Sequence, residues 1–300
     1  MKRILITGIN GLLGQRCFYE FKDDFEIIGL DLHSSSIVSP KVSYYTIDLT
    51  QRNQIKEVLL HEKPDYILNM AAFTNVDGAE NQRELCWKVN VESVEHLAYF
   101  AHKIGAKLVH VSTDYVFDGK SGPYRETDVP APLGYYGKSK LAGENALRKS
   151  DATFAILRTM VLFGTGIDIR LNFVTWLIQT LKEKKEVTIV DDQFGNPTLA
   201  DDLTKAIRCV IERDKWDLFH IGGLEIIDRY HFAVEIARYF DLDPKLINRT
   251  TTTALNQQVP RPLKSGFILE KAITELNHHP MTIETSLKIL KKQLKKAKLL

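Results

Sequence analysis

Short apolar runs and longer segments with helical spacing alternate through the first half of the chain. The apolar runs, such as "RILIT" and "EIIGL", are nearly continuous, which is typical of parallel strands buried on both faces. Because parallel strands need crossover connections, this alternation predicts an α/β fold with a Rossmann-type, doubly wound parallel sheet. The expected strands are Arg3–Thr7, Glu26–Asp31, Ser43–Ile47, Tyr66–Asn69, Lys107–Val111 and Ala155–Arg158, and the expected helices are Leu12–Phe21, Gln54–His61, Glu84–Ile104 and Tyr136–Arg148.

The regular alternation loosens after about Arg158. We expect residues 1–158, with returning segments near 187–222, to form a nucleotide-binding domain. Residues 159–300 then form mainly a smaller, C-terminal substrate-binding lobe that is interleaved with it. The elements predicted here are the helices Phe173–Lys185, Ala200–Glu212 and Arg229–Phe240, the strands Val187–Val190 and Asp217–Ile221, and an amphipathic helix after Thr282.

Composition narrows the class of protein. With 44% hydrophobic and 26% charged residues and a net charge of +2, the chain is an ordinary globular one and gives no argument for a nucleic-acid partner. Three widely spaced cysteines indicate neither a disulfide framework nor a zinc site, and His278–His279 has no obvious partner ligands, so we expect no metal. No apolar run is long enough for a membrane span, and the N-terminus reads as a strand and a turn instead of a secretory signal. The expected location is the cytoplasm.

The stretch "ILITGINGLLGQ" places three glycines between the first strand and its helix. The spacing G-x-x-G-x-x-G is a variant of the dinucleotide-binding fingerprint. Gly8 would allow the tight turn, Gly11 would leave room for a pyrophosphate, and Gly14 would let the helix pack closely. The free N–H groups at the helix N-terminus favour an anion there. The sequence therefore predicts a nucleotide site.

Other strand ends extend this predicted site. Asp31 could accept hydrogen bonds from the adenosine ribose, which favours NADH over NADPH, or it could cap its strand. Asp48 could reach the adenine or cap a helix, and the small residues Ala71 and Ala72 could admit the cofactor or serve packing. The candidate cofactor-binding residues are Gly8, Asn10, Gly11, Leu12, Leu13, Gly14, Asp31, Asp48, Leu49, Ala71, Ala72, Thr74, Asn90, Tyr136 and Lys140.

Tyr136 and Lys140 are four residues apart in a predicted helix, so their side chains share one face. A phenol has a pKa of about 10, and a nearby ammonium would lower it toward neutrality. Thr113, at the end of the fifth strand, could polarise a carbonyl at the same place. We interpret the three as catalytic candidates, although packing for Tyr136 and solvent for Lys140 would also explain the spacing.

These residues resemble the extended short-chain dehydrogenase/reductases. More specifically, "AAFTNVDGAE", "STDYVFDG", "PLGYYGKSKLAGE", "DDQFGNPT" and "RPLKSGFIL" are similar to segments of the dTDP-4-dehydrorhamnose reductase family. The resemblance implies reduction of a nucleotide-linked 4-keto sugar, with hydride passing from NADH or NADPH to sugar C4. It also implies that Thr113 hydrogen-bonds the keto oxygen, that Tyr136 donates the proton, and that Lys140 holds the nicotinamide ribose and tunes Tyr136.

The same resemblance implies a set of substrate-binding residues. Arg261 also fits a diphosphate on its own chemistry, because a guanidinium offers a planar fork to phosphate oxygens; a surface ion pair is the alternative. The implied ligand is a nucleotide-sugar substrate. The chain is also expected as a possible homodimer. The candidate substrate-binding residues are Asp114, Tyr115, Asn172, Gln193, Asn196, Pro197, Thr198 and Arg261.

The chain departs from the reductase pattern at two places. Its glycine turn reads "GLLG", where many of these reductases have a glutamine after the second glycine. After "LRT" the reductases usually continue with serine and tryptophan, and here the residues are Met160 and Val161. "GLLG" and "PAPLGYYGKSKLAGE" also resemble the regulatory β subunit of methionine adenosyltransferase. Two alternatives to a reductase follow: a cofactor-binding regulatory subunit without turnover, and a nucleotide-sugar epimerase that retains NAD.

Overall fold

A computed structural model describes residues 1–255 and 257–299 of the chain. Its centre is a parallel sheet with the strand order β11-β6-β5-β4-β1-β2-β3, seven strands among the described residues. This confirms the Rossmann-type fold predicted from the sequence. The strands are β1 (Arg3–Thr7), β2 (Glu26–Asp31), β3 (Ser43–Thr46), β4 (Tyr66–Asn69), β5 (Lys107–Thr113), β6 (Thr153–Thr159) and β11 (Leu218–His220).

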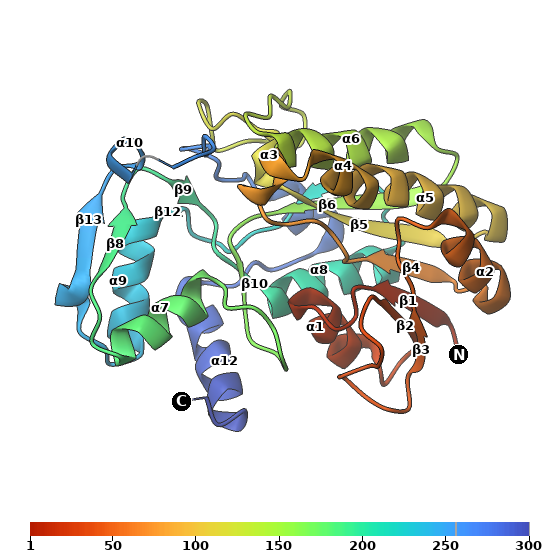
Figure 1. The fold of residues 1–300 in the computed structure, drawn as a ribbon, viewed down its shortest axis with the longest axis horizontal. Coiled ribbons are helices and arrows are strands. Elements are labelled where there is room, and N and C mark those ends of the chain that lie inside the picture. The colour runs from red at the N-terminus through yellow and green to blue at the C-terminus, as the bar shows by residue number, and fades with distance from the viewer. Residues whose placement is uncertain (256, 300) are drawn as a thin grey trace.

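Helices cover both faces of this sheet (Figure 1). On β1, the side chains of Ile4 and Ile6 lie in one core and that of Leu5 lies in the other, and all three are fully buried. This two-sided burial explains why the strands read as continuous apolar runs. One face carries α1 (Leu12–Phe21), α8 (Ala200–Arg213) and α11 (Glu270–Leu276), and the other carries α2 (Arg52–Glu62), α5 (Ser93–Ile104) and α6 (Tyr135–Lys149).

The helix expected over Glu84–Ile104 is interrupted. It consists of α4 (Arg83–Trp87), a π-helical turn at Lys88–Glu92, and α5. Apolar spacing does not distinguish a π turn from the α-helix around it, and such turns occur frequently at functional sites. The turn carries Asn90, one of the candidate cofactor-binding residues.

The smaller lobe has its own core, built by α7 (Phe173–Lys182), α9 (Arg229–Tyr239) and α12 (Ile283–Lys296). β8 (Val187–Val190) was expected among the segments that return to the nucleotide-binding domain. It pairs instead with β13 (Ile247–Thr250), because Val187 and Ile189 are buried in the core of the lobe. The chain rejoins the central sheet later, through α8 and β11.

The remaining elements are short. Elsewhere, the helix and strand boundaries differ from the expected ones by at most about three residues, as is usual at frayed ends. These short elements are α3 (Gly78–Asn81), α10 (Thr252–Leu255), the 3-10 turns Asp114–Val116 and Pro244–Leu246, and the strands β7 (Leu162–Phe163), β9 (Phe194–Gly195), β10 (Thr198–Leu199) and β12 (Ile227–Asp228).

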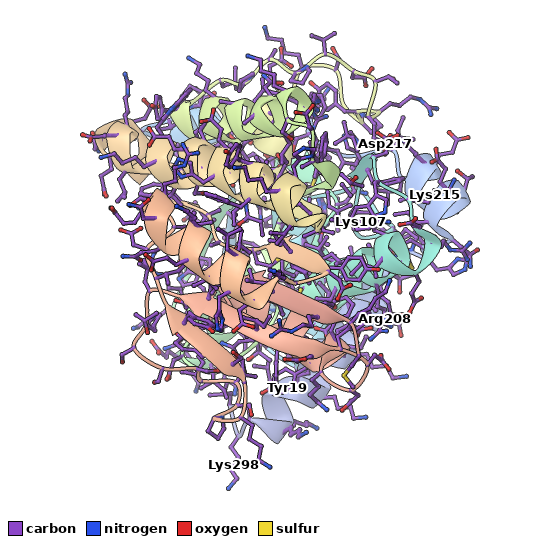
Figure 2. All side chains as sticks on the ribbon, turned by 90° about the vertical axis from the view of Figure 1, so that its right-hand side faces the viewer. Tyr19, Lys107, Arg208, Lys215, Asp217 and Lys298 are labelled. Atoms are coloured by element: carbon purple, nitrogen blue, oxygen red, sulfur yellow. The ribbon has the colours of Figure 1, made fainter. Side chains whose placement is uncertain are left out.

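The strands of the central sheet all run in the same direction, so their carboxyl ends share one edge. Figure 2 shows the side of the domain where strands begin: Lys107 is the first residue of β5, and Asp217 directly precedes β11. Within the described residues, no helix has both the length and the apolar character that crossing a membrane requires.

Candidate active site

The glycine turn has the geometry that its spacing predicts. Gly8 has a φ of 64°, and a Cβ there would lie 3.1 Å from the backbone of Ala71. A Cβ on Gly14 would lie 2.1 Å from the carbonyl oxygen of Gly8, so only glycine permits this packing of α1. Gly11 is the N-cap of α1, and its side-chain position faces only the Gly8 carbonyl, at 3.2 Å. No side chain caps the helix, which leaves an N-terminus suited to an anion.

Asp31 fastens this turn to the end of β2. Its carboxylate accepts hydrogen bonds from the backbone N–H groups of Asn10 (3.0 Å) and Leu32 (2.8 Å), so the strand-end role considered for it is present. The side chain of Asn10 is also occupied, because it donates to the carbonyl of Ser35 and accepts from the N–H of Ile37. Asn10 therefore orders the loop after β2, and its side-chain amide is not free for a ligand.

Three other cofactor candidates contribute mainly to the fold. Asp48 accepts a hydrogen bond from the N–H of Thr50 at 2.9 Å, which forms a turn ahead of α2. The N-cap of α2 is Gln51, so the helix-capping alternative for Asp48 is wrong. Leu49 packs against the core under α2, and Leu13 is buried under α1. Leu13 therefore leaves only backbone atoms for a ligand, whereas Leu49 is partly exposed.

Asn90 clamps the loop after β4 to α6. Its amide accepts from the N–H of Phe73 (2.9 Å) and donates to the hydroxyl of Ser139 (3.0 Å). It is 1% exposed, so its side chain shapes the nucleotide site instead of lining it. In the loop that it holds, Ala71 and Ala72 are partly buried and Thr74 is exposed.

The three catalytic candidates do meet. Thr113 is the last residue of β5, and its hydroxyl, which donates to Asp114 at 3.1 Å, lies near the phenol of Tyr136. Tyr136 is 8% exposed, and burial raises the pKa of its phenol while the nearby hydroxyl of Thr113 opposes that rise. Lys140 lies one turn along α6 and is 2% exposed. Its ammonium donates to the carbonyl oxygen of Val111 at 2.7 Å.

The expected lowering of the Tyr136 pKa by Lys140 is therefore not the dominant effect. Burial dominates for both residues: it raises the pKa of Tyr136 and lowers that of Lys140 to about 8. Helical spacing predicts that the two are neighbours, but it does not show how deeply they are buried. At neutral pH Tyr136 keeps its proton, as an acid that donates to a carbonyl oxygen must.

A small cleft, lined by Asp114 and Tyr115 but by none of the three catalytic candidates, brings several of the substrate candidates together. Tyr115 packs edge-on against Tyr136, with ring centroids 5.5 Å apart. Asp114 is buried and accepts a hydrogen bond from Ser265 at 2.7 Å; burial raises the pKa of this carboxyl. The cleft is lined by the predicted residues Asp114, Tyr115, Gln193 and Pro197 and by Val161, Arg229 and Ser265, which were not predicted.

Arg229 is the most informative of the missed residues. It begins α9 after the cap residue Asp228, and its guanidinium lies over the ring of Phe173 at 5.2 Å. Burial lowers its pKa, while the nearby groups of Tyr115 and Asp114 raise it. In the described part of the chain no ion pair engages its guanidinium, which leaves it available to an anionic ligand. An arginine directly after an apolar strand, in "IIDRYHF", was the available signal.

Arg261 forms an ion pair with Asp77, at 2.7 Å between Nη2 and Oδ2. This contact ties the loop after β4 to the segment that follows β13. The ion pair considered as an alternative for Arg261 is therefore present. Within the described residues, its buried Nη1 has no hydrogen-bond partner. The second nitrogen keeps diphosphate binding open as a prediction.

Two of the predicted substrate-binding residues form hydrogen bonds with backbone groups and are not free for a substrate. Asn172 caps α7, accepting from the N–H of Thr175 at 3.2 Å. Asn196 donates to the carbonyl of Gly223 and accepts from the N–H of Phe267, at 2.9 and 2.7 Å. Their amides are occupied, so they shape the lobe around the cleft. Thr198 is likewise buried and donates to the carbonyl of Asn196.

Val161 forms part of the cleft wall in an unusual conformation. Its φ is 46°, in the left-handed region that a β-branched residue rarely adopts. Such backbone strain costs about 1–3 kcal/mol and tends to occur at functional sites. Here it turns the chain at the position where the resembling reductases carry tryptophan, so a smaller side chain borders the cleft.

The chain is similar to known proteins along nearly its whole length. The family model described as "RmlD substrate binding domain" matches residues 1–296. A dTDP-4-dehydrorhamnose reductase of Aggregatibacter actinomycetemcomitans is 32% identical, over 96% of this chain and 98% of that one. The solved structure of dTDP-4-dehydrorhamnose reductase from Bacillus anthracis in complex with NADP is 30% identical, with a TM-score of 0.88, covering 98% of this chain and 100% of that one.

A protein with a different name has the same sequence identity over a smaller share of the chain. Methionine adenosyltransferase 2 subunit beta of Pongo abelii is 32% identical, over 87% of this chain and 79% of that one. The family match nonetheless extends over nearly the whole chain, and a relative named for the reductase exceeds 30% identity with almost full coverage. The chain belongs to the dTDP-4-dehydrorhamnose reductase family.

Proposed function

We propose that this protein reduces the 4-keto group of a nucleotide-linked deoxysugar with NADH or NADPH, converting dTDP-4-dehydro-L-rhamnose to dTDP-L-rhamnose. The observation that carries the proposal is the buried phenol of Tyr136, next to Thr113 at the carboxyl end of β5 and near a cleft with a partly buried arginine, Arg229. The names of the full-length relatives support the same reaction.

The glycine turn fits the dinucleotide that this reaction needs. The uncapped N-terminus of α1 would bind the pyrophosphate, and the side-chain position of Gly11 leaves the space for it. Lys140 would hold the nicotinamide ribose from α6. When bound, the reduced nicotinamide supplies the hydride that C4 of the sugar receives.

The chain's own groups then complete the reduction. Thr113 would turn its hydroxyl proton from Asp114 to the keto oxygen and so polarise the carbonyl. Tyr136 would give its phenolic proton to that oxygen as the negative charge develops, which yields the 4-hydroxy product and a phenolate. Arg229 and the free Nη1 of Arg261 would bind the diphosphate of the nucleotide sugar.

The experiment is to follow NADH and NADPH oxidation with dTDP-4-dehydro-L-rhamnose and to identify the product. We expect cofactor consumption that matches formation of dTDP-L-rhamnose. No consumption, together with a stable complex with a partner enzyme from native lysate, would point to a regulatory subunit. An isomerised sugar without net cofactor consumption would point to an epimerase.

Asp31 gives a prediction about the cofactor. Its carboxylate would repel a 2′-phosphate, and two unit charges 4 Å apart repel by about 1 kcal/mol in water and about 4 kcal/mol at an effective dielectric constant of 20. We expect NADH to have the higher kcat/KM, and we expect Asp31→Asn to change the NADH-to-NADPH ratio by about tenfold or more toward NADPH. Asparagine keeps an acceptor for the Asn10 N–H.

The matched control for this prediction is Asp48→Asn, which removes a carboxylate from the neighbouring strand end. It should change the kcat/KM for both cofactors by the same factor. An unaltered cofactor ratio in Asp31→Asn would show that this carboxylate does not face the ribose.

A further inference from the structure

A row of buried polar side chains runs across the central sheet to Lys140. Thr7, Asn69 and His110 occupy paired positions on the neighbouring strands β1, β4 and β5. The hydroxyl of Thr7 lies 2.8 Å from Oδ1 of Asn69, Nδ2 of Asn69 lies 3.0 Å from Nδ1 of His110, and Nε2 of His110 lies 3.3 Å from Nζ of Lys140. All four residues are at most 2% exposed. A histidine in the apolar run "KLVHV" was the sequence signal for this row.

The backbone fixes the direction of these hydrogen bonds. The N–H groups of Met70 and Ala71 both donate to the hydroxyl oxygen of Thr7, each at 3.1 Å, and so occupy its two lone pairs. The Thr7 proton is left for Asn69, which must therefore present its carbonyl oxygen to Thr7. Its NH₂ group then faces Nδ1 of His110, and that nitrogen must accept. His110 is consequently the neutral tautomer with its proton on Nε2.

The Nε2–H group points at an amine that has other partners. Lys140 already donates to the carbonyl oxygen of Val111 at 2.7 Å. The ammonium form of Lys140 has no lone pair, so it cannot accept a hydrogen bond from the Nε2–H of His110, 3.3 Å away, and the two donors repel. A neutral amine has a lone pair and can accept from that N–H. The arrangement at this nitrogen therefore favours the deprotonated form of Lys140.

Other ionisable groups around Lys140 act in the opposite direction. Glu144, one turn further along α6, and Cys86, on α4, both favour the ammonium. Glu144 is partly neutralised, because its carboxylate is held by Arg158 at 2.7 Å and by Ser112 at 2.6 Å. Tyr136, one turn before Lys140, keeps its proton at neutral pH because burial raises its pKa. His110 itself stays neutral, because burial and the charge of Lys140 lower its pKa.

We propose that His110 is a positioning residue for Lys140, held by Thr7 and Asn69 in the tautomer whose Nε2–H selects against the ammonium. This inference rests on the proposed reductase function for its kinetic consequence, but the tautomer does not depend on it. Burial is the largest cause that lowers the Lys140 pKa to about 8, and the direction of the hydrogen bonds adds to it. Lys140 is an ammonium below that pH, so activity that uses the ammonium should fall as the pH rises through about 8.

The tautomer can be measured without any substrate. Nitrogen-15 NMR of the wild-type protein distinguishes protonated from unprotonated ring nitrogens. We expect His110 to keep its proton on Nε2 from about pH 6 to about pH 9. This range includes the pKa of free histidine and the lowered pKa of Lys140. A proton on Nδ1, or titration of the ring near the ordinary histidine pKa, would overturn the proposal.

The substitution Asn69→Asp should reverse the direction of the hydrogen bonds at His110, with almost no change in side-chain volume. The carboxylate would accept from both Thr7 and Nδ1–H of His110, so that the lone pair of Nε2 faces Lys140 and stabilises the ammonium. We expect the proton to move to Nδ1 and the alkaline inflection of kcat/KM to rise by about one pH unit. Thr7→Ser keeps the hydroxyl and should change neither readout.

The two readouts separate this proposal from the added charge of the aspartate. Retention of the proton on Nε2 in Asn69→Asp would overturn the proposal, whether or not the inflection moves, because charge alone could move it. If the wild-type protein showed no reductase activity, the proposed function would be refuted, and the NMR result would still decide the tautomer of His110.

Discussion

Replacing Tyr136 with phenylalanine is expected to lower kcat for keto-sugar reduction by about 10²–10⁴-fold, the usual effect of removing a positioned general acid. The substitution removes only the phenolic hydroxyl. Phenylalanine keeps the buried ring volume and the edge-on contact with Tyr115, so the fold and the cleft should stay intact. The rate is measured as NADH or NADPH oxidation at saturating keto sugar, together with the thermal unfolding midpoint as a check on folding.

Tyr135 provides the matched control, because it is the adjacent residue with the same side chain. It is partly exposed, its ring lies beside Arg83 at 5.2 Å, and its backbone N–H donates to Glu80. Tyr135→Phe should keep kcat within a few-fold of the wild type. If Tyr136→Phe turned over as fast as Tyr135→Phe, Tyr136 would not be the acid.

Alanine at Gly11 and alanine at Gly14 are expected to fail in different ways. The added methyl group at Gly11 meets only the Gly8 carbonyl, at 3.2 Å, and the φ of −72° suits any residue. The free energy of unfolding should therefore change by no more than about 1 kcal/mol. The methyl group would occupy the space proposed for the pyrophosphate, which should weaken dinucleotide binding about ten- to hundredfold.

At Gly14 the methyl group would come within 2.1 Å of the Gly8 carbonyl oxygen, which cannot move without moving the turn. We expect Gly14→Ala to lower the free energy of unfolding by about 1–3 kcal/mol or more, and to lose dinucleotide binding with it. Chemical denaturation and calorimetric titration with NADH measure the two quantities separately. Unaltered NADH affinity in Gly11→Ala would contradict binding of the pyrophosphate at this turn.

The sequence predicts the architecture well because that architecture depends on local patterns. Continuous apolar runs can be satisfied only by two-sided burial, as Ile4, Leu5 and Ile6 show. The roles of Gly8 and Gly14 in the turn also follow from spacing alone, since a positive φ and a close approach both require glycine. The exception is β8, whose apolar residues are compatible with either core; its partner β13, far along the chain, decides between them.

The candidate site is less predictable, because the sequence does not show what a polar side chain faces. Asn90, Asn172 and Asn196 occur in segments near the site, yet their amides bind backbone groups that tertiary packing brings to them. The only sequence signal for Arg229 is its place after "IID", and its packing against Phe173 appears only in the folded chain. The pKa of Tyr136 is missed for the same reason, since the burial that raises it cannot be read from the spacing with Lys140.

The central claim is that hydride reaches sugar C4 while Tyr136 supplies the proton. The most direct measurement is reduction of dTDP-4-dehydro-L-rhamnose with nicotinamide cofactor that carries deuterium at its transferable position, followed by NMR of the sugar product. The account predicts dTDP-L-rhamnose with deuterium at C4 in a one-to-one ratio with oxidised cofactor. A product without deuterium at C4, or no product while the cofactor remains reduced, would contradict it.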